Sequence, residues 1–342
     1  MEFGISFLPH DTETMVRKAR RAEELGFELF GVADSQCIAR ELYTTLGAVA
    51  HATSSMEVGP VVTNPVTRHP AVTASAIATV HECTDGRAIL GIATGDSAVY
   101  TLGERPARLA ELEGTVEKLR TLWRGEPVEF DGESVSLRWL PETGTADDVS
   151  IMFAAEGPKT LRTAGRIADR VIVGLGLLPE VIEEAVGAVN EGARSAGRDP
   201  DDVEIWVLSQ VNVADSYRVA VDEIKMGIAA SAHHSLQFTF EGKSVPETYE
   251  DDLRELVNRY DPNEHEETGE TTNKRIVEEL GLTDYLADRY AIVGTVDDCV
   301  EKIRTIEATG AVDGIVMPLH REEDRDLLTR LGRDVLPRVR ED

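Results

Sequence analysis

The stretch VGPVVTNPVTRHPAVTASAIATVHECTDGRAILGIATGDSA (Val58–Ala98) contains two short apolar runs joined by a helical pattern. The runs Val58–Thr63 and Ala88–Ala93 have the length and composition of buried strands. Between them, a helix is predicted to open near Pro70, because proline fits the first helical position, and to end at Cys83. Strands that alternate with helices pair in parallel, so this stretch predicts one βαβ unit of an α/β fold.

The same alternation of strands and helices extends in both directions from this unit. The other predicted strands are Phe3–Leu8, Leu29–Ala33, Val149–Ala154, Val171–Val173, Val203–Val213 and Gly314–Met317. The clearest helical patterns beside them are Thr12–Leu25, Arg40–Ala52, Pro106–Trp123 and Asp324–Val339. Eight units of strand followed by helix predict a TIM (β/α)8 barrel that forms a single domain over residues 1–342.

Two insertions interrupt this rhythm, over about residues 125–148 and 231–290. The first precedes the strand Val149–Ala154 and contains Asp131-Gly132, which is a strong hairpin signal. The second precedes the strand Gly314–Met317 and is acidic, and we expect it to combine helices with a mobile loop at Asp261–Lys274. Insertions of this length often form lids or pocket walls.

Composition excludes several classes of protein. No apolar run in the 342 residues approaches the ~20 residues that span a bilayer. The 63 Asp and Glu residues against 35 Lys and Arg give a net charge of −28, which disfavours nucleic acid and anionic membranes as partners. Three separated cysteines (Cys37, Cys83 and Cys299) show neither a disulfide frame nor metal-type spacing, which suits a cytoplasmic protein.

The basic residues are skewed as well, with 7 Lys against 28 Arg. Scarce lysine beside abundant carboxylates indicates adaptation to a cytoplasm rich in salt, where ions screen the repulsion between like charges. The alternative is an ordinary acidic protein.

Carboxylates follow two of the predicted strands, at the barrel end where chemistry gathers. Asp34 follows Leu29–Ala33, and Asp96 follows Ala88–Ala93 within Thr94-Gly95-Asp96. Either carboxylate is a candidate acid or electrostatic partner in one pocket. The alternative interpretation is that each caps the next helix.

A candidate anion site follows the strand Val149–Ala154. The run Glu156-Gly157-Pro158-Lys159-Thr160 has the pattern of a helix start, where free backbone N–H groups and the positive end of the helix dipole attract anions. An ordinary capped turn is the alternative. Gly174 and Gly176 permit close approach of the backbone, but they are not part of a dinucleotide fingerprint.

No metal site is predicted from the sequence. His233-His234 lies in the second insertion without a third ligand at a fixed spacing, and the chain contains neither an H-E-x-x-H motif nor a Walker P-loop.

The opening stretch, Val58–Ala98, closely resembles the luciferase-like flavin or deazaflavin oxidoreductase superfamily. Within it, the resemblance is best to methylenetetrahydromethanopterin reductases that use coenzyme F420, of the halophilic archaeal type. Supporting segments are AEELGFELFGVADS (Ala22–Ser35), RELYTTLGAVA (Arg40–Ala50), AAEGPKTLRTAGRIADRVIVGLG (Ala154–Gly176) and AIVGTVDDCVEKI (Ala291–Ile303).

The resemblance implies where a cofactor would bind. Family members carry a non-prolyl cis peptide under the cofactor ring, and the matching positions here are Val61 and Val62. The other positions that match the cofactor site are Thr63, Thr94, Gly95, Glu156, Gly157, Lys159, Thr160, Gly174 and Gly176. Of these, Glu156, Gly157 and Thr160 match the phosphate-binding turn of the family, which favours the anion-site interpretation.

The implied chemistry is transfer of a hydride from reduced F420 to the methylene carbon of a tetrahydropterin of methanopterin or folate type. Asp34 and Asp96 are then candidate catalytic residues, and Arg40 would orient a carboxylated substrate tail. Ser6 is a departure in the substrate site, because the methanogen reductases have a glutamate there that is thought to act as the acid. A serine hydroxyl is too weak an acid for that role, so another group, water or a different substrate is implied.

Three alternatives remain open at this point: a monooxygenase that uses FMN, an F420-dependent enzyme for another small substrate, and a cofactor carrier without activity. Family members commonly dimerise through the helices that match Arg40–Ala52 and Pro70–Cys83, so a homodimer or homotetramer is expected.

Overall fold

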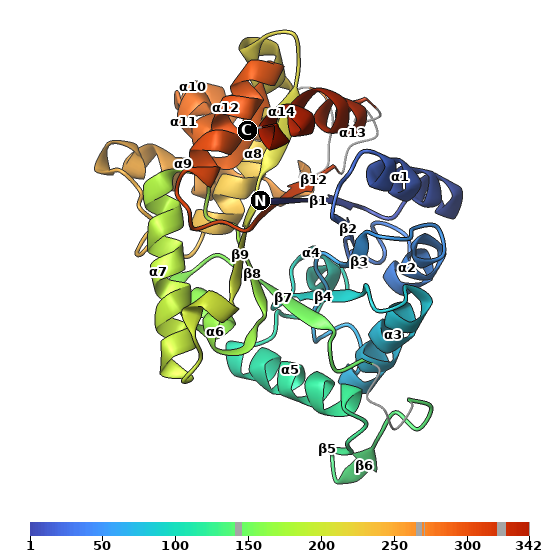
Figure 1. Ribbon diagram of the computed structural model, residues 1–342. Helices are drawn as coiled ribbons and strands as arrows, with labels where there is room; N and C mark the ends of the chain where they lie inside the picture. Colours follow the sequence, from blue (N-terminus) through green and yellow to red (C-terminus); the bar gives the residue numbers. More distant parts are fainter. Residues whose placement is uncertain (141–145, 265–268, 270, 320–325, 342) are drawn as a thin grey trace.

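Eight parallel strands form the barrel that the sequence predicts (Figure 1). The computed structural model describes residues 1–140, 146–264, 269, 271–319 and 326–341. Strand β1 lies between β2 and β12, and single bridges from Val58 to Ala88 and from Thr63 to Ile92 join the two outer strands of the sheet. The strands are β1 (Glu2–Phe7), β2 (Leu29–Val32), β3 (Glu57–Pro60), β4 (Ile89–Ile92), β7 (Ser150–Ala155), β8 (Arg170–Val173), β9 (Glu204–Leu208) and β12 (Gly314–Pro318).

Helices surround the strands, and their ends follow local sequence signals. Helix α1 begins after Asp11, whose carboxylate accepts the amide N–H of Thr14 at 2.9 Å. His69 accepts the N–H of Ala71 at the start of α3, and Pro70 occupies the first helical position as expected. The outer helices are α1 (Thr12–Glu24), α2 (Leu42–Ala50), α3 (Pro70–Cys83), α5 (Leu109–Trp123), α6 (Pro158–Ile167), α7 (Pro179–Ser195) and α12 (Val296–Glu307).

The C-terminal segment is helical as predicted, although Asp324 and the residue after it lie outside the described part. It consists of α13 (Leu327–Arg330), a π-helical turn (Leu331–Val335) and α14 (Leu336–Arg340). In the described residues no helix is both long and apolar enough to cross a membrane.

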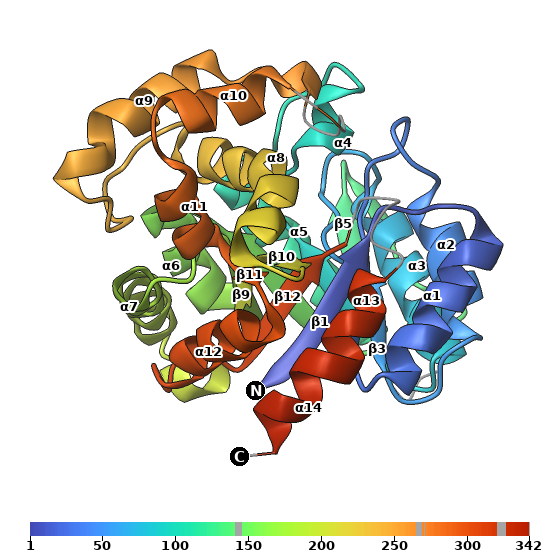
Figure 2. The same ribbon diagram turned by 90° about the horizontal axis from the view of Figure 1, so that it is seen from above.

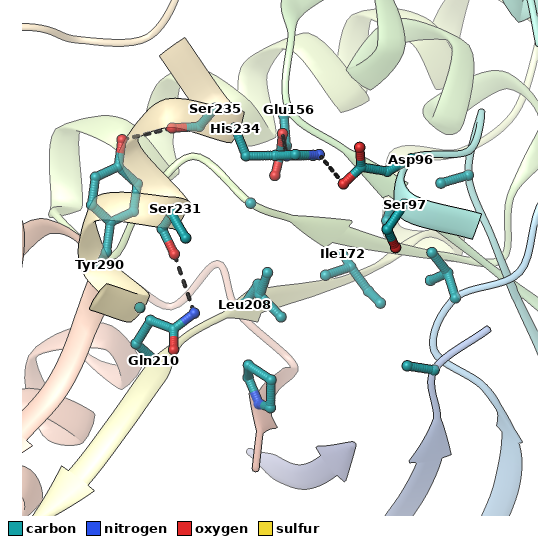
Figure 3. Close-up of a pocket in the computed structure, with 18 of the residues that line it drawn as sticks. Asp96, Ser97, Glu156, Ile172, Leu208, Gln210, Ser231, His234, Ser235 and Tyr290 are labelled. Atoms are coloured by element: carbon teal, nitrogen blue, oxygen red, sulfur yellow. Dashed lines mark hydrogen bonds and ion pairs between the residues drawn. The ribbon is translucent and has the colours of Figure 1, made fainter. Parts of the chain in front are cut away.

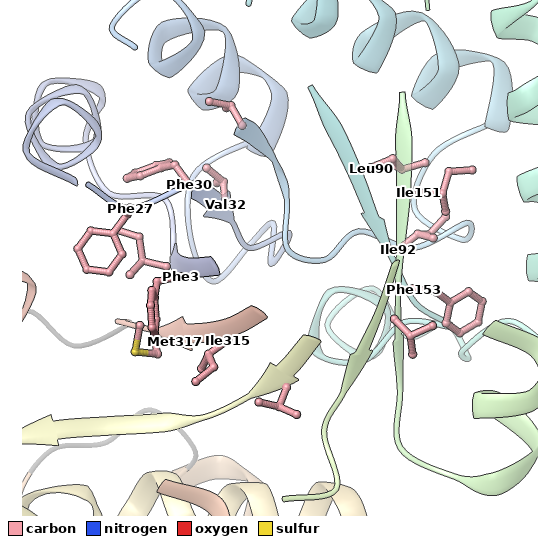
Figure 4. Close-up of a cluster of buried hydrophobic side chains, with 14 of the residues drawn as sticks. Phe3, Phe27, Phe30, Val32, Leu90, Ile92, Ile151, Phe153, Ile315 and Met317 are labelled. Carbon is pink, nitrogen blue, oxygen red and sulfur yellow. The ribbon is translucent and has the colours of Figure 1, made fainter. Parts of the chain in front are cut away.

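The barrel interior is filled at one level by Trp206 of β9, which is fully buried. A Cβ atom at Gly314 would lie 2.4 Å from the Trp206 ring, and one at Gly4 would lie 3.2 Å from it. The two glycines on neighbouring strands therefore make room for the indole. A larger apolar layer packs between the strands and the outer helices, and Figure 4 shows aromatic and aliphatic side chains of that layer.

The predicted strand Val203–Val213 is wrong as a single element. The chain breaks at Ser209 into β9 and β10 (Gln210–Val213), and β10 leaves the barrel to pair with β11 (Ala291–Gly294). The Ser209 hydroxyl donates to the carbonyl of Gln210 at 2.7 Å and accepts the N–H of Ile292 at 3.1 Å. The serine thus supplies hydrogen bonds where the regular ladder stops.

The β10–β11 pair supports a second apolar cluster formed by the helices that lie between these two strands in the sequence. These are α8 (Tyr217–Leu236), α9 (Glu250–Arg259), α10 (Thr272–Glu279) and α11 (Thr283–Tyr290). Figure 2 shows α8, α9 and α10 at the same end of the barrel as α4 (Ser97–Tyr100), away from the N-terminus. Part of the loop expected at Asp261–Lys274 lies outside the described residues.

The hairpin expected in the first insertion is present. Strands β5 (Val128–Phe130) and β6 (Glu133–Val135) pair antiparallel, and Asp131 and Gly132 both have positive φ, at 49° and 87°. That combination is the two-residue turn that an Asp-Gly sequence favours. Short 3₁₀ turns lie at Pro200–Asp202, Glu247–Tyr249 and Pro262–Glu264.

Gly165 of α6 and Gly192 of α7 let these two helices pack at close range, which leads to a first prediction. A Cβ at Gly192 would lie 2.0 Å from the carbonyl oxygen of Arg162, whereas one at Gly187 on the same helix would meet nothing within 4 Å. Gly192→Ala is expected to lower the free energy of unfolding by about 1–3 kcal/mol, because the helices must separate. Gly187→Ala is the matched control and should be neutral or stabilising by up to about 1 kcal/mol. Equal effects of the two changes in denaturant titrations would contradict this interpretation.

Candidate active site

A cavity of about 1470 Å³ opens at the carboxyl end of the barrel strands, the end where TIM barrels carry their chemistry. Its walls come from β1, from the segments that follow β2, β3, β4, β7 and β8, and from β10, α8 and the loop after α8. All but two of the predicted site residues line it. The predicted residues that line it are Ser6, Asp34, Val61, Val62, Thr63, Thr94, Gly95, Asp96, Glu156, Gly157, Lys159, Thr160 and Gly174.

The peptide bond between Val61 and Val62 is cis, as the sequence resemblance implied. Gly31 on the neighbouring strand explains how two β-branched residues fit at this position. A Cβ at Gly31 would lie 2.6 Å from a methyl group of Val61, so the missing side chain leaves room for that methyl. The next residue, Thr63, is buried and donates its hydroxyl to Asp34 at 2.6 Å.

Asp34 is held by a basic side chain and does not cap the helix that follows it. Arg68 donates to both carboxylate oxygens of Asp34, at 2.5 and 3.1 Å, and it also donates to Glu41 at 3.0 Å. Glu41, not Asp34, caps α2. Asp34 is therefore fixed as one half of a buried ion pair, which matches an electrostatic role better than a proton-donating one.

Arg40, which was expected to orient a substrate tail, does not line the cavity. Its side chain is exposed. The basic group that reaches the strand ends is Arg68, because its guanidinium is drawn to Asp34. The sequence showed two arginines near these strand ends without showing which one points inward.

The turn before α6 has the features of an anion site. Gly157 is the N-cap residue and supplies no side-chain cap, so the backbone N–H groups of Lys159 and Thr160 in the first turn have no partner within the helix. Lys159 and Arg162 also line the cavity and add positive charge there. A phosphate or carboxylate group fits this helix start.

The two glycines predicted to form a wall differ in position. Gly174 lines the cavity, and a Cβ there would lie 2.5 Å from a carboxylate oxygen of Glu156, so the glycine makes room for that side chain. Gly176 does not line the cavity. Its φ is +127°, and a Cβ would lie 2.7 Å from Arg289 of α11, which shows that Gly176 serves the contact between this loop and α11.

Asp96 and Glu156 meet a third side chain, His234 of α8, across the cavity wall (Figure 3). The Nδ1 atom of the imidazole makes a short contact with Glu156, and Nε2 lies 3.4 Å from Asp96. Asp96 makes no side-chain cap to α4, so the capping alternative does not apply to it. Attraction to Glu156 raises the pKa of His234 well above the usual 6.5, against the effect of burial, and Asp96 raises it further.

Behind His234, a set of polar groups joins α8 to the loop after it and to α11. Lys243 is buried, and its ammonium group donates to the carbonyl of Ser235. The hydroxyl groups of Ser235 and Tyr290 lie 2.7 Å apart, and Gln210 donates to Ser231 at 3.2 Å. Burial lowers the pKa of Lys243 from its usual 10.5, an effect that Glu156 opposes and Arg289 increases.

Sequence reasoning considered His234 only as a metal ligand and did not include Lys243. Both belong to the second insertion, and a sequence pattern does not show which loop of a barrel an inserted helix faces. Within the described ranges, no group of three or more His, Cys, Asp or Glu side chains is arranged to hold a metal ion. In the sequence, the pair His233-His234 was the one available signal that this insertion contributes to the site.

Comparison with known proteins agrees with this geometry. The sequence profile of the family described as "Luciferase-like monooxygenase" matches residues 1–313. The chain belongs to the luciferase-like monooxygenase family. A relative in this family, the 5,10-methylenetetrahydromethanopterin reductase of Methanolobus tindarius, is 30% identical over 90% of each chain. The F420-dependent glucose-6-phosphate dehydrogenase of Nakamurella multipartita is 30% identical over 86% of this chain and 81% of its own.

Solved structures of other luciferase-like proteins have the same fold. The coenzyme F420-dependent tetrahydromethanopterin reductase of Methanopyrus kandleri superposes with a TM-score of 0.80 over 99% of each chain, at 24% identity. The oxygenating constituent of 3,6-diketocamphane monooxygenase from Pseudomonas putida, in complex with FMN, has a TM-score of 0.68 at 18% identity. The luciferase-like barrel of this chain is thus confirmed, and its named relatives are oxidoreductases.

Proposed function

We propose that this protein is an oxidoreductase that uses coenzyme F420 and reduces a 5,10-methylene-tetrahydropterin, of methanopterin or folate type, to the 5-methyl form. The observation that carries the proposal is the agreement, over 90% of both chains, with a relative named as a methylenetetrahydromethanopterin reductase. The glucose-6-phosphate dehydrogenase among its relatives is also named as F420-dependent, which supports the cofactor assignment independently of the substrate.

The residues present fit a large anionic cofactor with a flat ring. The cavity of about 1470 Å³ exceeds the ~1,000 Å³ upper range of pockets for one small molecule, so it has room for a cofactor and a substrate together. The cis peptide at Val61–Val62 forms part of its floor, and the uncapped start of α6 with Lys159 offers a place for phosphate. Reduced F420 supplies a hydride when it is bound.

The chain's own residues have four tasks in such a reaction. The Val61–Val62 backbone and Thr94-Gly95 bound the space for a ring, while the first turn of α6 holds the anionic group. Asp34, fixed by Arg68, supplies a negative charge near the strand ends. Helix α8 forms one wall of the cavity and limits the access of water to it. A proton must also reach the substrate nitrogen that regains a lone pair when the methylene bridge opens.

An FMN-dependent monooxygenase is the second candidate, favoured by the FMN-bound structural relative. Parallel titration of the purified protein with F420 and FMN in molar salt separates the two. We expect micromolar affinity for F420 and no binding of FMN, followed by turnover of a methylene-tetrahydropterin. Lys159→Gln should weaken F420 binding about tenfold, equivalent to ~1.4 kcal/mol, whereas Lys118→Gln on α5, away from the cavity, is the control. Preference for FMN would overturn the proposal.

A further inference from the structure

We infer that His234 is the proton donor of this site, with Nε2 as the atom that releases the proton and Glu156 as the residue that positions the ring. This inference deepens the proposed function, on which it rests for the identity of the substrate. It begins from the contacts of the imidazole itself.

Both ring nitrogens of His234 face carboxylates. Nδ1 contacts Glu156, and Nε2 lies 3.4 Å from Asp96. A neutral imidazole carries one N–H and one lone pair, so it would turn that lone pair toward a carboxylate oxygen. The doubly protonated ring satisfies both contacts. The geometry therefore favours an imidazolium that lines the cavity.

The two contacts differ in a way that gives each nitrogen a different task. The side chain of Glu156 is 25% exposed and sits in the space that Gly174 leaves for it, so its contact with Nδ1 fixes the ring. The side chain of Asp96 is 54% exposed, and its carboxylate lies farther from Nε2. Nε2–H is consequently the proton held less tightly and on the more open side. This division of tasks follows the general logic of an oriented catalytic histidine.

Ser6 and Asp34 are less suited to donate a proton. Ser6 carries a hydroxyl, which is a very weak acid at neutral pH. Asp34 accepts hydrogen bonds from Arg68 and Thr63, so its oxygens are occupied as acceptors. The charged groups that act on His234 are Glu156 and Asp96, and the ammonium of Lys243 acts on Glu156 in turn.

The proton balance of the step is complete. The hydride, with its electron pair, forms a new C–H bond at the methylene carbon of the substrate. The bond from this carbon to one of the two bridging nitrogens breaks, and its electron pair stays on that nitrogen, which takes the proton from Nε2. His234 regains a proton from solvent, because 44% of its side chain is exposed toward the cavity. Overall, the oxidation of the cofactor releases one hydride and one proton. The proton released to solvent balances the proton that His234 takes up from solvent.

The experiment uses His234→Gln with His233→Gln as the matched control. His233 is adjacent in the sequence, but it stacks on Tyr260 at 4.2 Å between ring centroids and does not line the cavity. We expect His234→Gln to lower kcat for methylene-tetrahydropterin reduction by at least about 100-fold, the range of general acid catalysis, with little change in F420 affinity. His233→Gln should retain kcat.

The pH profile provides the readout that a merely structural role would not change. Because the protonated ring is the active form, wild-type kcat should fall as the pH rises through the raised pKa of His234. This limb should be absent in His234→Gln and should move to lower pH in Glu156→Gln. Retention of the limb, or of kcat, in His234→Gln would overturn the inference.

A second measurement needs no substrate. In ¹⁵N-histidine NMR titrations of the cofactor-free protein, the signals that vanish in His234→Gln identify this ring among the 8 histidines. Its pKa should lie well above 6.5 and fall in Glu156→Gln. A value at or below 6.5 would overturn the inference even if the enzyme is active. Failure of wild-type protein to reduce either pterin while it binds F420 would instead contradict the proposed function.

Discussion

Replacement of Arg289 by methionine is expected to lower the free energy of unfolding by about 3–5 kcal/mol, although Arg289 does not line the cavity. The side chain is fully buried in α11. Its guanidinium donates to the carbonyl oxygens of Leu175, Lys243 and Ser244, at 3.1, 2.6 and 3.1 Å. Methionine preserves the apolar stem but leaves these carbonyls without donors, which accounts for most of the expected loss.

The same contacts connect Arg289 to the site. The guanidinium joins the loop after β8 to the segment that contains Lys243, and both segments border the cavity. Chemical denaturation in molar salt measures the loss of stability. Arg17→Met is the control, because Arg17 is exposed on α1, and its effect should stay within about 0.5 kcal/mol. A change below about 1 kcal/mol for Arg289→Met would show that water or a rearranged loop satisfies the three carbonyls.

Much of the barrel could be predicted because its strands and helices carry local signals. The stretch from Val58 to Ala98 shows a strand, a helix opened by Pro70 and a second strand, and the structure has β3, α3 and β4 there. The failure at Ser209 has a physical reason. Val211 and Val213 continue a strand-like alternation beyond the polar pair Ser209-Gln210, and only the pairing of β10 with the distant β11 ends the barrel strand.

The site was predictable where residues follow barrel strands and unpredictable where they do not. Asp34, Asp96 and Glu156 follow β2, β4 and β7, so topology alone brings them to one end of the barrel. The approach of His234 depends on how α8 packs against β10 and β11, which involves contacts far apart in the sequence. Arg40 and Gly176 do not line the cavity for a related reason, since long-range partners decide which arginine and which glycine face it.

Transfer from molar salt to dilute buffer is expected to unfold the protein, with loss of most of its helical circular dichroism. The net charge of −28 spreads repulsion over the fold, and the Debye length grows from about 3 Å at 1 M salt to about 10 Å at 0.1 M. Repulsion between carboxylates also acts locally, at the amino end of the barrel. Glu57 and Glu204 both pair with Arg170, and Glu2 lies in their field.

Burial raises the pKa of Glu2, Arg170 opposes that shift, and the neighbouring carboxylates Glu57 and Glu204 increase it. A carboxylate whose pKa is raised on folding destabilises the fold when it ionises, so its cost appears as the pH rises through that pKa. Glu2→Gln should therefore stabilise the protein at neutral pH, and molar salt should reduce only the part of this effect that the neighbouring carboxylates contribute, because salt does not screen the effect of burial. Glu13→Gln, at an exposed position on α1, should show no such salt dependence. Full retention of folded structure in dilute buffer would refute the halophilic interpretation, because the repulsion would then be too weak to matter.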